Sequence, residues 1–452
     1  MLSTIIRKEF LDKISTLRFF IALLLSAGLT TISASVLSNN YAQELADYHA
    51  RVKLHTETKS EGLVIVDRKP SVLSVLFPGI ENNSARSVRL EVDLYPETIE
   101  TINDNPLSVL FTAVDWTFII GIVMSLLAIL FAYDTVCGER ETGTLALMTS
   151  NSTPRPMLIL GKWIGGYLCL ILTCFVGWFS GFLILINHPQ IQFTSANWSS
   201  VGWLLFGALL YLACIFALGV LVSTLTSRSS TAIVALLLLW GAGVFVIPNL
   251  GPDFAKVAYS IPSFVSHVRE LKLAEKDLHR QRQKWHDEAS LEVIDKRMSL
   301  PDAWKMQVDA EARFINAKKE ALSKLTKGYR REVDKQEQIA AAIASLSPYA
   351  CFTSFVTQLA GTDSRSEAQF IATAERFDNE YFDDLNRVLQ HTLPHIQTDS
   401  PIEKRNEINF SYTERTVNER LKSGFVPLAL LLLFTTLFLI GGYAAFLRYD
   451  VR

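Results

Sequence analysis

The amino-acid sequence predicts an α-helical polytopic membrane protein. We expect six transmembrane helices and an extracytoplasmic domain that combines a mixed α/β part with a helical hairpin. The distribution of charge is the first observation behind this prediction. The chain of 452 residues is 19% charged, yet positions 163–252 carry one charged residue, Arg228, whereas positions 253–422 hold 53 of the 88. One part of the chain therefore suits lipid and another suits water.

The second observation is the length of the uncharged stretches. A helix that rises about 1.5 Å per residue needs about 20 apolar residues to cross a bilayer core. Six stretches meet this requirement, at 17–38, 112–133, 163–186, 201–225, 230–250 and 424–447. Their backbone must be helical, because an unpaired peptide group in lipid costs several kcal/mol.

A seventh uncharged stretch, 338–362, is not expected to cross the membrane. It contains Pro348 and many Ser, Thr and Gln residues but few large aliphatic ones, so its insertion would gain little. We expect an apolar segment that packs in the outer domain or lies on the outer leaflet.

The basic residues near the ends of the six stretches predict the orientation. They gather on one side of the membrane, at Arg7, Lys8, Lys13, Arg18, Arg140, Arg155, Lys162, Arg228, Arg448 and Arg452. Both termini are then cytoplasmic, segments 39–110 and 251–423 lie outside, and we expect a bacterial inner membrane. A cleaved signal peptide that ends near Ser33-Ala34-Ser35 is the alternative. The net charge of −2 gives no attraction to nucleic acid.

The outer segments have different patterns. Segment 39–110 begins as a helix and then alternates like strands at Leu63–Val66 and Val88–Tyr95. Segment 251–423 is rich in helix-forming residues from Phe264 to Met298 and from Ala303 to Ser345. The break between these two runs predicts a hairpin of two long helices.

Two stretches on the cytoplasmic side are the candidate functional segments. Residues 1–16 place apolar side chains at helical spacing and suit an interfacial amphipathic helix that includes Arg7, Lys8, Glu9 and Phe10; a polar extension of the first span is the alternative. The loop 134–162 carries an acid–base–acid run and a glycine in Glu139, Arg140, Glu141, Thr142, Gly143, Thr144 and Leu145. We expect a short helix there that also bears the apolar Leu145, Leu147 and Met148, lies across the membrane face and inserts into a groove of a soluble partner.

This loop resembles the motif of ABC-2-type permeases, the transmembrane subunits of ABC transporters. Its similar residues are Glu139–Leu145, Pro154-Arg155 and Gly161-Lys162, and Lys8-Glu9-Phe10 with Arg18 and Phe20 resembles the interfacial helix of the family. Two outer stretches are similar to the copper-enzyme-maturation branch, whose large extracytoplasmic domain has no known function. They are Arg68–Ser74, and Leu346-Ser347-Pro348 with Ala360-Gly361-Thr362-Asp363 and Phe370.

The resemblance implies a non-catalytic subunit. Residues 139–145 would form the coupling helix that docks on an ATPase subunit, present in two copies, which binds ATP and Mg²⁺. A second permease, identical or different, would complete the assembly, and an envelope protein is a further candidate partner. The large outer segments depart from the typical family pattern. Export, mechanotransmission or envelope assembly, and a receptor that translocates nothing therefore stay open.

If ATP drives this protein, the residues themselves indicate that a separate subunit binds it. The sequence contains neither G-x-x-x-x-G-K-[ST] nor H-E-x-x-H, and its histidines are scattered, so we predict no catalytic residue, no cofactor and no metal site. Gly161/Gly165 and Gly177/Gly181 fit small-xxx-small packing, either within the chain or at a dimer seam.

Overall fold

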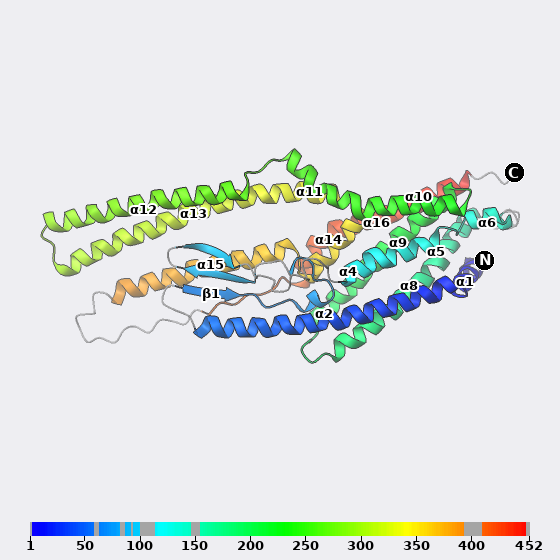
Figure 1. The fold of residues 1–452 in the computed structure, drawn as a ribbon, viewed down its shortest axis with the longest axis horizontal. Coiled ribbons are helices and arrows are strands. Elements are labelled where there is room, and N and C mark those ends of the chain that lie inside the picture. Colours follow the sequence, from blue (N-terminus) through cyan, green and yellow to red (C-terminus); the bar gives the residue numbers. More distant parts are fainter. Residues whose placement is uncertain are drawn as a thin grey trace.

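The computed structural model describes residues 2–57, 63–81, 86–91, 94–99, 114–145, 154–392 and 409–448. The molecule is elongated, with a bundle of helices at one end and a helical hairpin reaching away at the other (Figure 1). The first and last described residues of the chain both lie at the outer tip of the bundle. We call this the terminal end of the bundle, and the end that faces the hairpin and the sheet the domain end.

Six helical segments of the described residues are long and apolar enough to cross a membrane, as predicted. They are α2 (Leu17–Glu57), Trp116–Glu141, α8 (Arg155–Asn187), α9 (Ser195–Leu225), Ser229–Ala258 and α16 (Val417–Leu447). The second comprises α4 (Trp116–Phe118), η3 (Ile119–Met124), α5 (Ser125–Ala132) and α6 (Cys137–Glu141), and the fifth comprises α10 (Ser229–Gly241), η4 (Ala242–Val246) and α11 (Ile247–Ala258). This confirms the polytopic helical fold.

Several of these helices extend beyond the uncharged stretches. Helix α2 continues for 41 residues and leaves the bundle to pack against the outer sheet. Helix α9 begins at Ser195, where the Thr194 side chain caps it by accepting from the Asn197 N–H. The polar residues 195–200, which precede the predicted stretch 201–225, therefore form its first turns, because Ser, Thr and Asn are favourable at a helix start.

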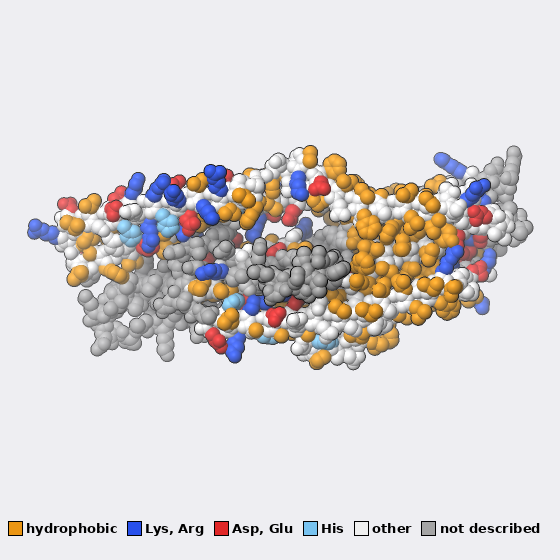
Figure 2. Space-filling view, in the orientation of Figure 1, with side chains coloured by type: hydrophobic (Ala, Val, Ile, Leu, Met, Phe, Trp, Pro, Cys, Tyr) orange, Lys and Arg blue, Asp and Glu red, His pale blue; other side chains and the backbone are white. Residues whose placement is uncertain are grey.

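The spans differ in how deeply they are buried. In the most apolar stretch of α9, 67% is buried, whereas only 17% is buried in α16 and in the fifth span. The exposed apolar side chains form a broad belt across the face of the bundle that Figure 2 shows, with charged residues gathered at the terminal end beyond it. Because such a belt is unfavourable in water, it marks the surface that lipid or another membrane chain covers.

The segment 338–362 lies in a place that we did not predict. Its first residues end α13, and the rest forms α14 (Pro348–Ala360), which packs against α9 and α16 rather than within the outer domain or on the leaflet surface. The ring of Phe352 stacks on Tyr211 with centroids 4.8 Å apart. Gly207 makes room for Phe355, because a Cβ at Gly207 would lie 2.3 Å from its ring. Thirteen residues are too few to span a bilayer, but they suffice to fill the domain end of the bundle.

Two π-helical turns lie beside α14. Gly121 in η3 accepts a hydrogen bond from the Tyr211 hydroxyl at 2.8 Å, and Gly243 in η4 accepts one from Ser347 at 2.5 Å. A π-turn leaves the regular ladder of hydrogen bonds locally widened, so its carbonyls are open to side chains. The insertion of α14 therefore coincides with irregular turns in two spans.

The two glycine pairs serve packing within the chain. A Cβ at Gly165 would lie 2.7 Å from the Cβ of Glu9 in α1 (Leu2–Ile14), and Gly161 faces Ile5 of the same helix. Gly177 and Gly181 face α2 in the same way, through Ser26 and Thr30. The glycines therefore allow α1 and α2 to lie close against α8.

The outer domain contains a small sheet and three long helices. Strands β1 (Leu63–Asp67), β2 (Ser87–Glu91) and β3 (Leu94–Ile99) pair antiparallel in the order β1-β2-β3, and Leu63 lies opposite Glu91. Val92 and Asp93 of the predicted second strand lie outside the described residues. The alternating Val64, Val66, Val88 and Leu90 pack on α15 (Ser364–Thr392). The short η1 (Val72–Val75) follows β1.

The hairpin consists of α12 (Phe264–Asp295) and α13 (Leu300–Ala344). Ser299 ends the turn between them, and its hydroxyl caps α13 by accepting from Asp302. Arg282 and Glu311 join the helices by two hydrogen bonds of 2.9 and 2.7 Å. The C-terminal part of α13 packs along α11, so the hairpin is firmly connected to the fifth span.

Candidate functional site

A buried lysine joins the two candidate functional segments at the terminal end of the bundle. Lys162 of α8 lies 2.7 Å from Glu9 in α1 and 2.6 Å from Glu139 in α6, and only 1% of its side chain is exposed. The close approach at Gly165 allows Glu9 to reach this position. A buried ammonium group needs such partners, because an unpaired charge in a poorly solvated site costs several kcal/mol.

A second ion-pair cluster lies beside the first. Asp134, which precedes α6, accepts from Lys13 at 2.9 Å and from Arg18 at 2.8 Å. Lys13 also donates to the Phe131 carbonyl at 2.6 Å, and Arg18 lies over the ring of Tyr133. These contacts attach the end of α1 and the beginning of α2 to the end of the second span.

The acid–base–acid run makes contacts within its own chain. Arg140 donates to the Thr226 carbonyl at 3.0 Å. Glu141 accepts from the backbone N–H and the hydroxyl of Ser229, at 2.9 and 2.8 Å, and so caps the start of α10. Residues 142–144 are exposed. The motif therefore holds the second and fifth spans together and leaves one exposed turn for a partner.

The apolar part of the motif differs from the prediction. Leu145 is 1% exposed and packs in a small cluster within the chain instead of projecting toward a partner; its neighbours there are Val136, Leu158, Ile159 and Phe446. Leu147 and Met148 lie outside the described residues. Gly143, with φ of +73°, adopts the left-handed conformation that allows the chain to turn from α6 toward Leu145.

The predicted amphipathic helix corresponds to α1. Glu9 is buried and Phe10 packs against the bundle core, whereas Arg7 and Lys8 are exposed. Helix α1 therefore buries Glu9 against α8 and Phe10 against the core, and directs Arg7 and Lys8 outward.

A cavity of about 320 Å³ opens between α1 and α6. Its lining residues are Glu9, Asp12, Lys13, Thr16, Arg18, Phe131, Asp134, Thr135, Gly138, Glu139 and Thr142. Four of them are carboxylates and two are cations. The Oε2 atom of Glu139 is buried without a hydrogen-bond partner among the described residues. The cavity therefore offers acceptors to a cationic group that the described residues do not supply.

Sequence reasoning found the segments but missed the cavity. Asp12, Asp134 and Thr142 approach one another because α1 folds back along α8, which no local pattern reveals. The available signal was the charge of Asp134 and Lys162 at the ends of two uncharged stretches.

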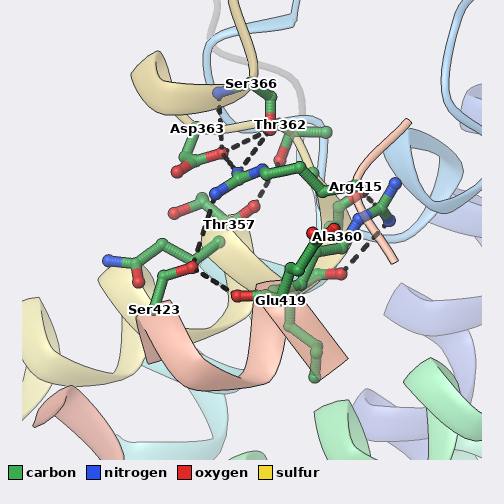
Figure 3. A network of polar contacts seen from close by, with 12 residues as sticks. Thr357, Ala360, Thr362, Asp363, Ser366, Arg415, Glu419 and Ser423 are labelled. Atoms are coloured by element: carbon green, nitrogen blue, oxygen red, sulfur yellow. Dashed lines mark hydrogen bonds and ion pairs between the residues drawn. The ribbon is translucent and has the colours of Figure 1, made fainter. Parts of the chain in front are cut away.

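A second polar cluster joins the domain to the bundle at the domain end. Arg415 donates to Asp363 at 2.5 Å and to the Ser366 hydroxyl at 2.6 Å, and its other amine contacts Ser423 (Figure 3). Arg420 donates to the Ala360 carbonyl at 3.2 Å, near the end of α14. These arginines connect the start of α16 to the turn between α14 and α15. We call this cluster, together with the Arg68 contacts described next, the joint.

The two outer stretches that resembled one branch of the family meet at the joint. Arg68 donates to the Gly361 carbonyl at 3.2 Å and pairs with buried Glu81 at 3.3 Å. Burial raises the pKa of Glu81, although the charge of Arg68 opposes this shift. Ser71 donates to the Ala360 carbonyl at 3.2 Å. The cavity beside Arg68 measures about 10 Å³, so the joint is closely packed.

The described residues contain no group of three or more His, Cys, Asp or Glu side chains arranged to hold a metal ion. The charged clusters at the two ends consist of ion pairs between segments that are distant in sequence. These ion pairs hold the segments in position relative to one another.

Comparison with known proteins agrees with the resemblance seen in the sequence. Residues 3–451 match the model of the ABC-2 family transporter proteins. A probable ABC transporter permease protein NosY of Pseudomonas aeruginosa is 36% identical over 135 residues, which cover 29% of this chain and 48% of that protein. The protein of the same description from Stutzerimonas stutzeri is 42% identical over 55 residues, 12% of this chain and 20% of that protein. These alignments span about half or less of each relative, but the family model covers nearly the whole chain, and the chain therefore belongs to the ABC-2 family of transporter proteins.

Proposed function

We propose that the chain is the membrane-spanning permease subunit of an ABC transporter and couples ATP hydrolysis by a separate ATPase subunit to movement of its spans and outer domain. Two ATPase copies, which bind ATP and Mg²⁺, and a second permease complete the assembly. The protein lies in a bacterial inner membrane with both termini in the cytoplasm and the hairpin outside. The observation that carries this proposal is the carboxylate-lined cavity between α1 and α6.

The cavity suits a docking role because of its charge and its walls. A cationic side chain of the ATPase would enter beside Asp12 and the unpartnered oxygen of Glu139. Glu9 and Glu139 both bind Lys162, so a displacement of either segment acts on α8. Buried ion pairs of this kind resist separation and suit the transmission of movement.

The outer domain is attached so that it moves with the spans. Helix α2 is one helix from the terminal end to the sheet, and the joint holds the start of α16 to α14 and α15. This continuity favours mechanical transmission to an envelope partner as the second candidate function, beside export.

The docking assignment is tested by co-purifying the chain with the candidate ATPase subunit encoded in neighbouring genes. We expect Glu139→Ala to weaken the complex and lower ATP hydrolysis, and Glu141→Ala, which loses the α10 cap, to have a smaller effect. If both variants co-purify at full ATPase activity, the coupling assignment is wrong. A wild-type chain that binds no ATPase subunit would favour a receptor without an ATPase.

Export and transmission are separated by what changes ATP hydrolysis in proteoliposomes. Stimulation by a small molecule or lipid that also appears on the far side supports export. An ATPase that responds only to an envelope protein bound to 253–422 supports transmission.

A further inference from the structure

A second cavity at the terminal end has a different chemistry from the carboxylate-lined one. It measures about 550 Å³ and lies between the last turns of α9 and α16, next to α6. Its lining residues are Arg140, Leu221, Thr224, Leu225, Gly441, Ala444, Ala445 and Arg448. Two of these are arginines and none is acidic, so the cavity attracts anions.

The shape of this cavity follows from small residues on α16. Gly441, Ala444 and Ala445 carry little or no side chain, so the wall of α16 is hollow opposite Leu221. The nearest Leu221 methyl would lie 3.3 Å from a Cβ at Gly441. The remaining walls are mostly apolar, which distinguishes the cavity from a site for a free, fully hydrated anion.

The position of the cavity matches the depth of lipid headgroups. Leu225, at the end of α9, and Leu447, at the end of α16, are 65% and 45% exposed, and the apolar stretch of α16 is only 17% buried. The exposed apolar surface of the span is therefore continuous with the cavity, while the two arginines lie where the span ends. Guanidinium groups bind phosphate oxygens in pairs, and basic cavities between helices on the cytoplasmic side suit lipid headgroups.

We propose that this cavity binds the headgroup of an anionic phospholipid, with Arg448 and Arg140 contacting the phosphate and the acyl chains following the exposed face of α16. This lipid site goes beyond the proposed coupling function, because its cavity and the carboxylate-lined docking cavity have no lining residue in common. A bound lipid would also connect α6 to α16.

The test measures retention of phosphatidylglycerol by native mass spectrometry after a delipidating detergent wash. We expect the wild-type chain to retain it in preference to phosphatidylcholine. Loss of one arginine near anionic lipid lowers affinity roughly fivefold, so Arg448→Gln should reduce retention by about that factor. Ala445→Leu, which fills the cavity without changing charge, should reduce it as well. The matched control is Arg228→Gln, an exposed arginine at the same end that does not line the cavity.

Two results would overturn the proposal. Equal retention by wild type, Arg448→Gln and Ala445→Leu would place the lipid elsewhere on the chain. Displacement of phosphatidylglycerol by millimolar inorganic phosphate, or thermal stabilisation by phosphate alone, would show a free-anion site instead of a lipid site. Thermal unfolding of each variant establishes that it is folded, and Arg448→Gln, which alters an exposed side chain, keeps the test decisive if Ala445→Leu does not fold.

Discussion

The two ends of the bundle use buried basic residues in opposite ways. At the terminal end, one lysine holds two carboxylates from separate surface segments, beside an open cavity of about 320 Å³. At the domain end, Arg68, Arg415 and Arg420 bind carboxylates and backbone carbonyls around a turn, and the cavity beside Arg68 is about 10 Å³. The open end suits a partner that arrives and leaves, and the closed end suits a rigid connection.

The chemistry of the basic groups fits this division. A lysine ammonium is a compact charge on a flexible stem and tolerates rearrangement of its partners. The planar guanidinium of an arginine binds several acceptors in one plane. The arginines of the joint therefore fix the orientation of the connected segments as well as the distance between them. We therefore expect substitutions at the two ends to differ in kind.

The largest expected effect is on Lys162. Lys162→Met leaves Glu9 and Glu139 as neighbouring carboxylates in a poorly solvated site, which should cost about 3–5 kcal/mol of folding stability. Thermal unfolding in detergent measures this loss, and the triple variant with Glu9→Gln and Glu139→Gln should recover part of it. Lys256→Met is the control, because that side chain is 67% exposed. Equal unfolding midpoints for Lys162→Met and Lys256→Met would contradict the description of the terminal end.

A pair of glycines compares the two ends directly. Gly361 at the joint and Gly143 in the segment Glu139–Leu145 have similar φ values of +76° and +73°. Alanine in this conformation costs roughly 1–2 kcal/mol at either position. At Gly361 the new Cβ would also lie 2.8 Å from the Arg420 guanidinium carbon, whereas no atom of the described residues lies within 4 Å at Gly143.

We therefore expect Gly361→Ala to lower the unfolding midpoint more than Gly143→Ala. Asparagine tolerates the left-handed conformation. Gly143→Asn should consequently be nearly neutral, while Gly361→Asn should stay destabilising because the clash persists. A reversed order would show that the joint is loose.

The smallest expected effect concerns the hairpin beyond the joint. His286 lies 2.7 Å from Glu311 and 2.6 Å from Gln307, and the hydrogen bond to Glu311 raises the pKa of His286 above its usual value near 6.5, although the charge of Arg282 opposes this. A raised folded-state pKa gives stability that is present below pH 6.5 and is lost as pH rises through the raised value.

The protection of α12 and α13, which is the intrinsic hydrogen-exchange rate divided by the rate observed at the same pH, should accordingly be greater at acidic pH, and His286→Gln should remove this difference. We expect the exchange of α1 and α6 to be the same in both proteins at each pH. A His286-dependent change that spread to α1 and α6 would show that the two ends are less separate than described.

The spans could be predicted because a charge in lipid is costly, which leaves a readable absence of charge along the sequence. The position of α14 could not be predicted in this way. This thirteen-residue apolar helix lies within the bundle because Gly207 leaves space opposite it and because Tyr211 stacks on Phe352. Gly207 and Tyr211 are far from α14 in the sequence. The segment Glu139–Leu145 was recognisable by its residues as a motif of the family. Its connection through Lys162 to Glu9, 153 positions earlier, follows only from the fold.

We propose that the open cavity between α1 and α6 receives the ATPase subunit. The most direct measurement is the Kd between the detergent-solubilised chain and its candidate ATPase subunit, determined for wild type, Asp12→Lys and Asp253→Lys. Asp12 is exposed at the cavity rim, and Asp253 is an exposed carboxylate at the domain end. We predict that Asp12→Lys weakens binding at least tenfold, or about 1.4 kcal/mol, and that Asp253→Lys leaves it unchanged. Equal Kd values for all three proteins would contradict the account.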